Sequence, residues 1–114
     1  VNNTVIDMNN VTPGPPQIAF VNSKDGTPSS NCLMRNNIAQ TIQVGEGATE
    51  DHNYRIPSYA AYADLFADYL NFNLHLKAGA APINAGSSEL APPIDIEGRA
   101  RPQGSAVDIG AYEY

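Results

Sequence analysis

Short apolar segments separated by polar turns fill the first half of the chain. They lie at 4–8, 18–21, 32–35, 41–44 and 52–54. Runs of this length bounded by turn residues predict strands of about four residues. No Asn-Gly pair is available to close a two-residue hairpin between them. We therefore expect each strand to pair in parallel with a strand one repeat away.

The spacing of these segments indicates a repeat. Leu33 and Asn53 are 20 residues apart, and Val5 and Leu33 are 28 apart, with the proline-rich insert 12–16 in the longer interval. Coils of roughly 20 to 25 residues are typical of solenoid repeats. The pattern favours a β-solenoid over a sandwich, with an unrelated β protein as the open alternative.

Asparagine is abundant, with twelve residues in the chain. Asn36 and Asn37 follow the segment 32–35, and Asn53 precedes Tyr54 in the next one. Asparagine tolerates left-handed backbone conformations and bonds to its own turn. We expect these side-chain amides to stack at equivalent corners; the alternative is that they are ordinary surface turn residues.

The pattern changes after residue 57. Ser58 is placed to cap a short helix near 58–66, Asn73–Leu76 alternates like a strand, and 77–86 is rich in turn residues. The tail 106–114 is expected to form a last strand. We predict one domain in which 1–57 forms the last coils and 58–114 a capping segment that covers an open end.

Charge and composition limit the classes of partner that the chain is expected to bind. The net charge is −6 with six basic residues, which gives no cationic surface for nucleic acid. No apolar stretch approaches the roughly 20 residues of a membrane span, and no signal peptide opens the chain. The first residue is Val1, which suggests a processed or truncated N-terminus. Cys32 is alone, so we expect neither a disulfide nor a thiolate metal cluster.

Six motifs occur in order in the second half. They are Asp64–Phe66, Asn73–Gly79, Pro82–Gly86, Asp95–Gly98, Arg101–Gly104 and Val107–Glu113. Together they resemble the C-terminal segment of secreted bacterial proteins of the pectate-lyase-like superfamily, including choice-of-anchor Q domain proteins. The resemblance covers about 62–113. It implies a mainly β fold, a right-handed parallel β-helix, and a protein located outside the cell or on its surface.

The resemblance also implies a structural role for three residues. Asp95, Arg101 and Asp108 match family positions that look like a clamp, in which an Arg fork between carboxylates fixes an irregular cap. Two departures concern proline: the family usually has one between the residues matching Asp64 and Leu65, and its other proline usually sits one place before Pro82. No cofactor and no metal site are predicted, with a calcium ion held by an acid pair as the sharper alternative.

Candidate chemistry is sparse. A polysaccharide lyase needs a base and a cation near its substrate, for which Arg35, Arg55 and His52 are the candidates. Arg35 and Arg55 are 20 residues apart and are expected to lie near each other on adjacent coils if the repeat holds. Tyr54 and Tyr59 are candidates for sugar contact. For all five residues, a structural or solvated placement is the competing interpretation.

Three functions follow as hypotheses. The first is a non-catalytic terminal piece of a secreted protein associated with polysaccharide binding or processing. The second is a lyase, hydrolase or epimerase acting on acidic polysaccharide, and the third is the stalk of a cell-surface adhesin or spike. Because the chain has few coils, residues 1–8 are expected to present an open strand edge. We expect this edge to be covered by missing N-terminal coils or by a homo-oligomer partner packed top to top.

Overall fold

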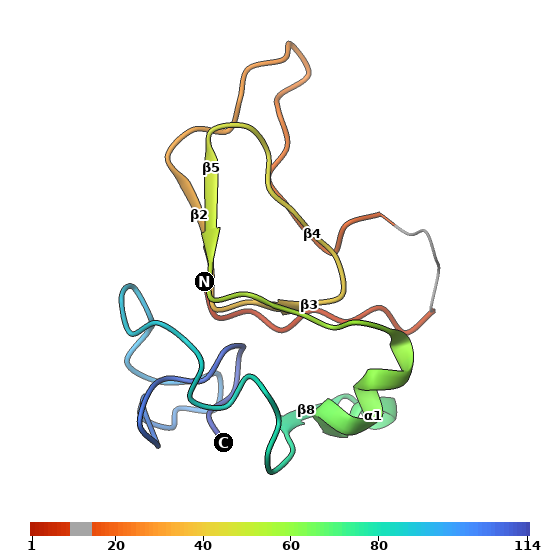
Figure 1. Cartoon of the computed structure of the whole chain (residues 1–114), viewed down its shortest axis with the longest axis vertical. Helices are drawn as coiled ribbons and strands as arrows, with labels where there is room; N and C mark the ends of the chain where they lie inside the picture. The colour runs from red at the N-terminus through yellow and green to blue at the C-terminus, as the bar shows by residue number, and fades with distance from the viewer. Residues whose placement is uncertain (10–14) are drawn as a thin grey trace.

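The computed structural model describes residues 1–9 and 15–114, so part of the predicted insert 12–16 lies outside the described residues. The molecule measures 44 × 32 × 20 Å. Seen down its shortest axis, the first half forms triangular loops that overlie one another, and the second half lies beside them (Figure 1). We refer to residues 1–9 and 15–57 as the stack and to residues 58–114 as the side lobe.

Three parallel strand pairs build the stack. They are β1 (Ile18–Ala19) with β4 (Ile42–Gln43), β2 (Cys32–Arg35) with β5 (Ala48–Asp51), and β3 (Ile38–Ala39) with β6 (Tyr54–Arg55). A further parallel bridge joins Thr4 to Ile38. Residues 2–5, 36–39 and 53–55 therefore form three successive layers at one side of the triangle.

The side lobe has little regular structure. It begins with the 3₁₀ turn η1 (Tyr59–Ala61) and α1 (Tyr62–Leu65), continues through β7 (Phe66–Asp68) and the 3₁₀ turn η2 (Tyr69–Asn71), and reaches β8 (Asn73–Leu76). Strands β7 and β8 pair antiparallel. Among the residues after Leu76, turns and bends prevail, with an isolated bridge between Ile94 and Ala100.

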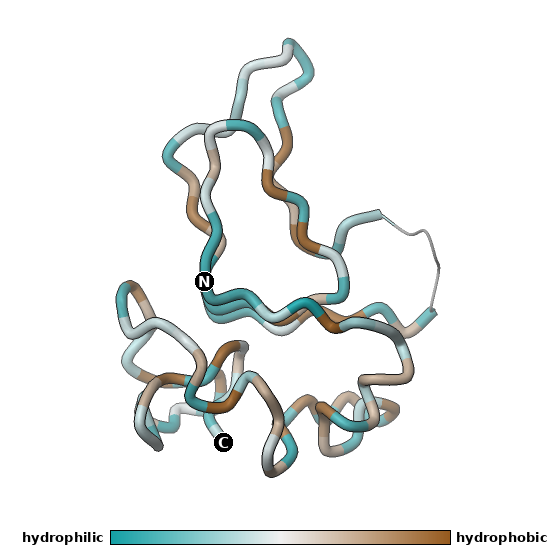
Figure 2. The backbone as a smooth tube through the Cα atoms, in the orientation of Figure 1, coloured by the Kyte–Doolittle hydropathy of each residue, from teal (hydrophilic) through white to brown (hydrophobic). Residues whose placement is uncertain are grey.

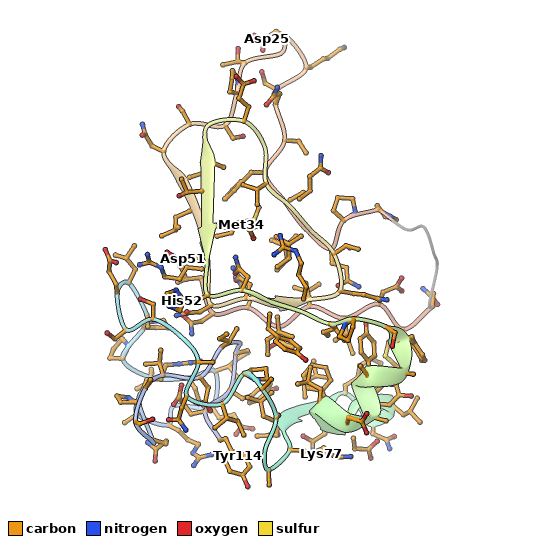
Figure 3. All side chains as sticks on the ribbon, viewed as in Figure 1. Asp25, Met34, Asp51, His52, Lys77 and Tyr114 are labelled. Atoms are coloured by element: carbon orange, nitrogen blue, oxygen red, sulfur yellow. The ribbon has the colours of Figure 1, made fainter. Side chains whose placement is uncertain are left out.

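The main apolar core lies between the stack and the side lobe. Ile38 and Ile56 come from the stack, and both are almost fully buried. The lobe contributes Tyr62, Leu65, Phe66, Leu76 and Ile109. Burying an aliphatic side chain of this size contributes roughly 1.5–3 kcal/mol, so this contact joins the two parts strongly. Inside the triangle, the buried Met34 fills part of the stack (Figure 3).

The prediction of a right-handed parallel β-helix is wrong. The described residues form two-stranded sheets, small in extent, and no solenoid is found among them. The register shows why the repeat was misleading: Leu33 pairs with Thr49 and Ile38 with Tyr54, both 16 residues apart, whereas Ile18 pairs with Ile42, 24 apart. The spacing of 20 between Leu33 and Asn53 therefore joins residues that do not face each other.

The expected last strand is also absent. Residues 106–114 contain no strand, although Val107 and Ile109 are buried as an apolar face requires. Instead of crossing an end of the stack, this segment runs along its side: the Gly110 N–H donates to the Asn36 carbonyl at 2.8 Å, and the Ala111 N–H donates to Thr4 Oγ1 at 3.0 Å.

Candidate functional site

A buried ion pair organises the end of the chain. The Arg101 Nη1 lies 2.7 Å from the Glu113 Oε1, with side chains 2% and 0% exposed. Arg101 also donates to the carbonyls of Asp108 and Gly110, while the Glu113 carboxylate accepts the N–H groups of Asp108 and Gln103. The pair therefore fixes backbone that has no strand partner of its own.

The two acids of the predicted clamp have a different role. Asp95 accepts the backbone N–H groups of Glu97 and Arg99 through Oδ1 and that of Glu113 through Oδ2. Burial acts to raise the pKa of Asp95, but these hydrogen bonds and the nearby Arg101 charge outweigh it and lower the pKa. Asp95 thus acts as a local anchor for three amides.

Asp108 works in the same way. Its Oδ1 accepts the Asn84 N–H at 2.7 Å, and its Oδ2 accepts the Tyr114 N–H at 2.6 Å. The structure therefore brings Asp95, Arg101 and Asp108 into one network, but the carboxylate paired with Arg101 belongs to Glu113. Sequence reasoning placed Glu113 inside a family motif and gave it no role.

A ladder of asparagine side chains runs along one corner of the stack, where three hydrophilic segments overlie one another (Figure 2). Asn3 donates through its N–H and Nδ2 to Asn37 Oδ1, and Asn37 donates through the same groups to Asn53 Oδ1. The residue before each rung has positive φ: 54° at Asn2, 57° at Asn36 and 48° at His52. The predicted stacking of Asn37 and Asn53 is confirmed.

Arg35 lies beside this corner in a cluster of charges. Its Nε and Nη2 bind the two oxygens of Asp51 at 2.5 and 2.6 Å, and its Nη1 binds Glu89 Oε2 at 2.8 Å. The hydrogen bond from Arg35 lowers the pKa of Asp51 to about 2. Arg35 thus links the stack to the side lobe, and its guanidinium is engaged with two carboxylates.

The other catalytic candidates lie in separate contacts. Arg55 binds Glu50 at 2.7 Å in an exposed pair. Its strand partner is Ala39, whereas Arg35 pairs with Asp51 in another sheet, so the two arginines do not face one site. His52 is exposed and lies 3.2 Å from Asp51 at the corner (Figure 3).

The two tyrosine candidates pack against neighbouring side chains. The Tyr59 ring lies 5.1 Å from the Tyr62 ring and 5.8 Å from the Tyr69 ring. Burial raises the pKa of Tyr59, with a further contribution from Tyr69. Tyr54 is half-buried and packs on the apolar core. Both tyrosines are therefore engaged in packing within the fold.

An open groove of about 480 Å³ borders the first layer of the stack. Val1–Val5 form one wall, and Pro92, Ile94, Ile96 and Ala111 form most of the other. The charged side chains lining it are those of Asp95 and Arg101, which are engaged as described above. The groove therefore presents backbone and apolar surface, without a free acid and base in position for proton transfer.

Within the described ranges, no group of three or more His, Cys, Asp or Glu side chains is arranged to hold a metal ion. The carboxylates of Asp95 and Asp108, which the calcium alternative requires, accept backbone amides. The described residues also include no helix long and apolar enough to cross a membrane.

Comparison with models of protein families, with curated proteins and with solved structures gives no match. The resemblance of 62–113 to the pectate-lyase-like superfamily thus rests on the six sequence motifs alone.

Proposed function

We propose that this chain is a non-catalytic structural module, in which the side lobe fastens a small stack of parallel strands into one rigid unit. The observation that carries this proposal is the use of the charged side chains. Arg35, Arg55 and Arg101 each bind a carboxylate of the same chain, and Arg35 and Arg101 also hold two segments together.

The enzyme hypothesis receives less support from this geometry. A lyase or epimerase requires a cation free to stabilise the developing negative charge and a base within reach of the same carbon. The candidates Arg35, Arg55 and His52 sit in different contacts, and the bordering groove contains none of them. A hydrolase requires two carboxylates that face a common groove. In the groove beside the first layer, Asp95 is the one acidic residue in the described lining.

Secretion and association with polysaccharide enter the proposal through the sequence resemblance. In this view the module belongs to an extracellular protein whose polysaccharide-contacting surface lies outside these residues. The chain alone is then expected neither to bind nor to degrade uronic-acid polymers.

The test is an activity assay on acidic polysaccharides, read as new reducing ends and as the ultraviolet absorbance of unsaturated products. We expect no turnover by the wild type. Any turnover by the wild type would contradict the proposal. Its loss in Arg35→Ala but not in the control Lys24→Ala, with both variants folded by circular dichroism, would place the active site at Arg35.

A further inference from the structure

The first and third layers of the stack end in hydrogen-bonding groups that the described residues leave unused. We name Asn3–Val5 the first edge and Asn53–Arg55 the second edge. On the first edge, the Thr4 N–H and carbonyl and the Asn3 Oδ1 have no partner among the described residues. On the second edge, the same holds for the Asn53 N–H and carbonyl and the Arg55 N–H.

The unused groups of the first edge are complementary to those of the second edge, because each layer repeats the same hydrogen-bonding pattern. The Asn3 carbonyl accepts the Ile38 N–H, and one layer later the Asn37 carbonyl accepts the Tyr54 N–H, both at 2.8 Å. Asn3 and Asn37 also donate to the Oδ1 of the asparagine in the following layer. Continuing this rule, the layer after Asn53–Arg55 must begin with an asparagine that offers Oδ1, followed by a residue with a free N–H and carbonyl. The first edge has that composition.

The first edge also borders apolar surface that is open to solvent. Ile94 and Ile96, in the opposite wall of the groove, are 51% and 69% exposed, and Val1 is 43% exposed. In the same lining, the buried Arg101 Nε has no hydrogen-bond partner among the described residues. Backbone and apolar groups of a polypeptide suit this groove better than a small anion, because Asp95 lines it and Glu113 already neutralises Arg101.

We infer that the first edge is a docking site for a second copy of this chain, which adds its second edge as one more parallel layer. The Asn53 N–H of the incoming copy donates to Asn3 Oδ1, its Arg55 N–H donates to the Thr4 carbonyl, and its Asn53 carbonyl accepts the Thr4 N–H. The resulting dimer keeps one free first edge on one copy and one free second edge on the other, so the contact does not close and longer chains of copies form. This inference stands apart from the non-catalytic role proposed above.

The experiment measures solution mass by light scattering over a wide range of protein concentration, at low and high salt. The wild type is expected to exceed 12.2 kDa and to grow with concentration. Because each copy carries a net charge of −6, added salt should strengthen the association by screening repulsion. A mass that stays at 12.2 kDa under every condition overturns the inference.

Two proline variants identify the edges. Thr4→Pro removes the outward N–H of the first edge, and Arg55→Pro removes that of the second edge. Each variant alone is expected to be monomeric, because self-association needs both edges. Mixed together, they leave one intact edge of each kind and should form a dimer of twice 12.2 kDa. Association of the wild type without a dimer in this mixture contradicts the assignment of the edges.

Matched controls separate the contribution of the backbone N–H groups to association from that of the side chains. Thr4→Val and Arg55→Ala change the side chains but keep the N–H groups, so they should associate like the wild type. If a proline variant loses its circular dichroism spectrum, Asn3→Ala takes its place: it deletes the exposed Oδ1 acceptor and should weaken association about fivefold to tenfold. An unchanged mass distribution in Asn3→Ala would exclude the first edge as the contact.

Discussion

The stack and the side lobe of this small molecule are held together by different means. In the stack, neutral backbone groups pair between parallel strands, and asparagine side chains extend the same pattern at the corner. In the side lobe after Leu76, charged side chains replace the missing strand partners. Asp95, Asp108 and Glu113 together accept backbone N–H groups from several separate turns.

This contrast implies different responses to mutation. A neutral hydrogen bond contributes about 1 kcal/mol net, and the stack has many of them, so each loss is small. The lobe depends on a pair that is shielded from water, where removal of one partner leaves the other charge uncompensated. The irregular half should therefore be the more sensitive to a single substitution.

The largest effect is expected for Arg101→Met. The change leaves the Glu113 carboxylate buried without its cation, which should lower the free energy of unfolding by about 3–5 kcal/mol in urea titrations. The control is Arg55→Met, which breaks an exposed Arg–Glu pair and should cost about 1 kcal/mol or less. Equal losses in the two variants would remove the distinction between the regions.

Gly110→Ala tests the contact between the two regions. Gly110 has φ of 105°, and an added Cβ would approach Ile38 Cδ1 to 2.6 Å and Thr4 Oγ1 to 2.7 Å. Strain and displacement together should cost about 2–3 kcal/mol in thermal or urea unfolding. Gly98→Ala has a similar φ of 87°, and no atom of the described residues lies within 4 Å of its added Cβ, so the difference between the two variants reports the close approach.

Asn37→Ala probes the ladder within the stack. The substitution removes the Oδ1 that accepts two bonds from Asn3 and the Nδ2 that donates to Asn53. We expect a loss of about 1–3 kcal/mol, because polar groups of the neighbouring layers lose their partners. Asn9→Ala, an exposed position, serves as the control and should change stability little. A null result for Asn37→Ala would mean that backbone pairing alone holds the layers.

The smallest predicted effect concerns pH. Asp51 has a pKa of about 2 in the folded chain against 3.8 ordinarily, so its ion pair stabilises the fold above about pH 4. The stabilisation is lost as the pH falls toward 2. The carboxylate is about a third exposed, which limits the effect to about 1 kcal/mol or less. Asp51→Asn should flatten the decline of stability between pH 4 and 2 relative to the exposed control Asp64→Asn.

The sequence revealed local features better than their register. The segments at 32–35 and 73–76 are strands with those bounds, and helical turns occupy 59–65. The strand Ala48–Asp51 was missed because its apolar content is low and its two middle positions, Thr49 and Glu50, are exposed. Pairing depends on which residues meet across the layers, and a regular spacing of apolar segments does not specify that when the loops between them differ in length.

The sequence predicted only part of the candidate site, for a related reason. Asp95, Arg101 and Asp108 do form one network, but the carboxylate paired with Arg101 is Glu113, twelve residues further on. No periodic pattern relates two residues on separate irregular turns. The asparagine corners were recognisable in part, because asparagine tolerates the positive φ found at Asn2 and Asn36, directly before two of the ladder residues; in the third layer His52 has that conformation.

Amide hydrogen exchange measured by NMR on the wild type and Arg101→Met tests the central claim most directly, because it reads the two regions residue by residue. We predict that the Ile109 and Gly110 amides, which bond Pro82 and Asn36, lose most of their protection in the variant. The Tyr54 and Ile56 amides of the stack should retain a larger share. Equal losses at all four amides, or no loss at Ile109 and Gly110, would contradict the account.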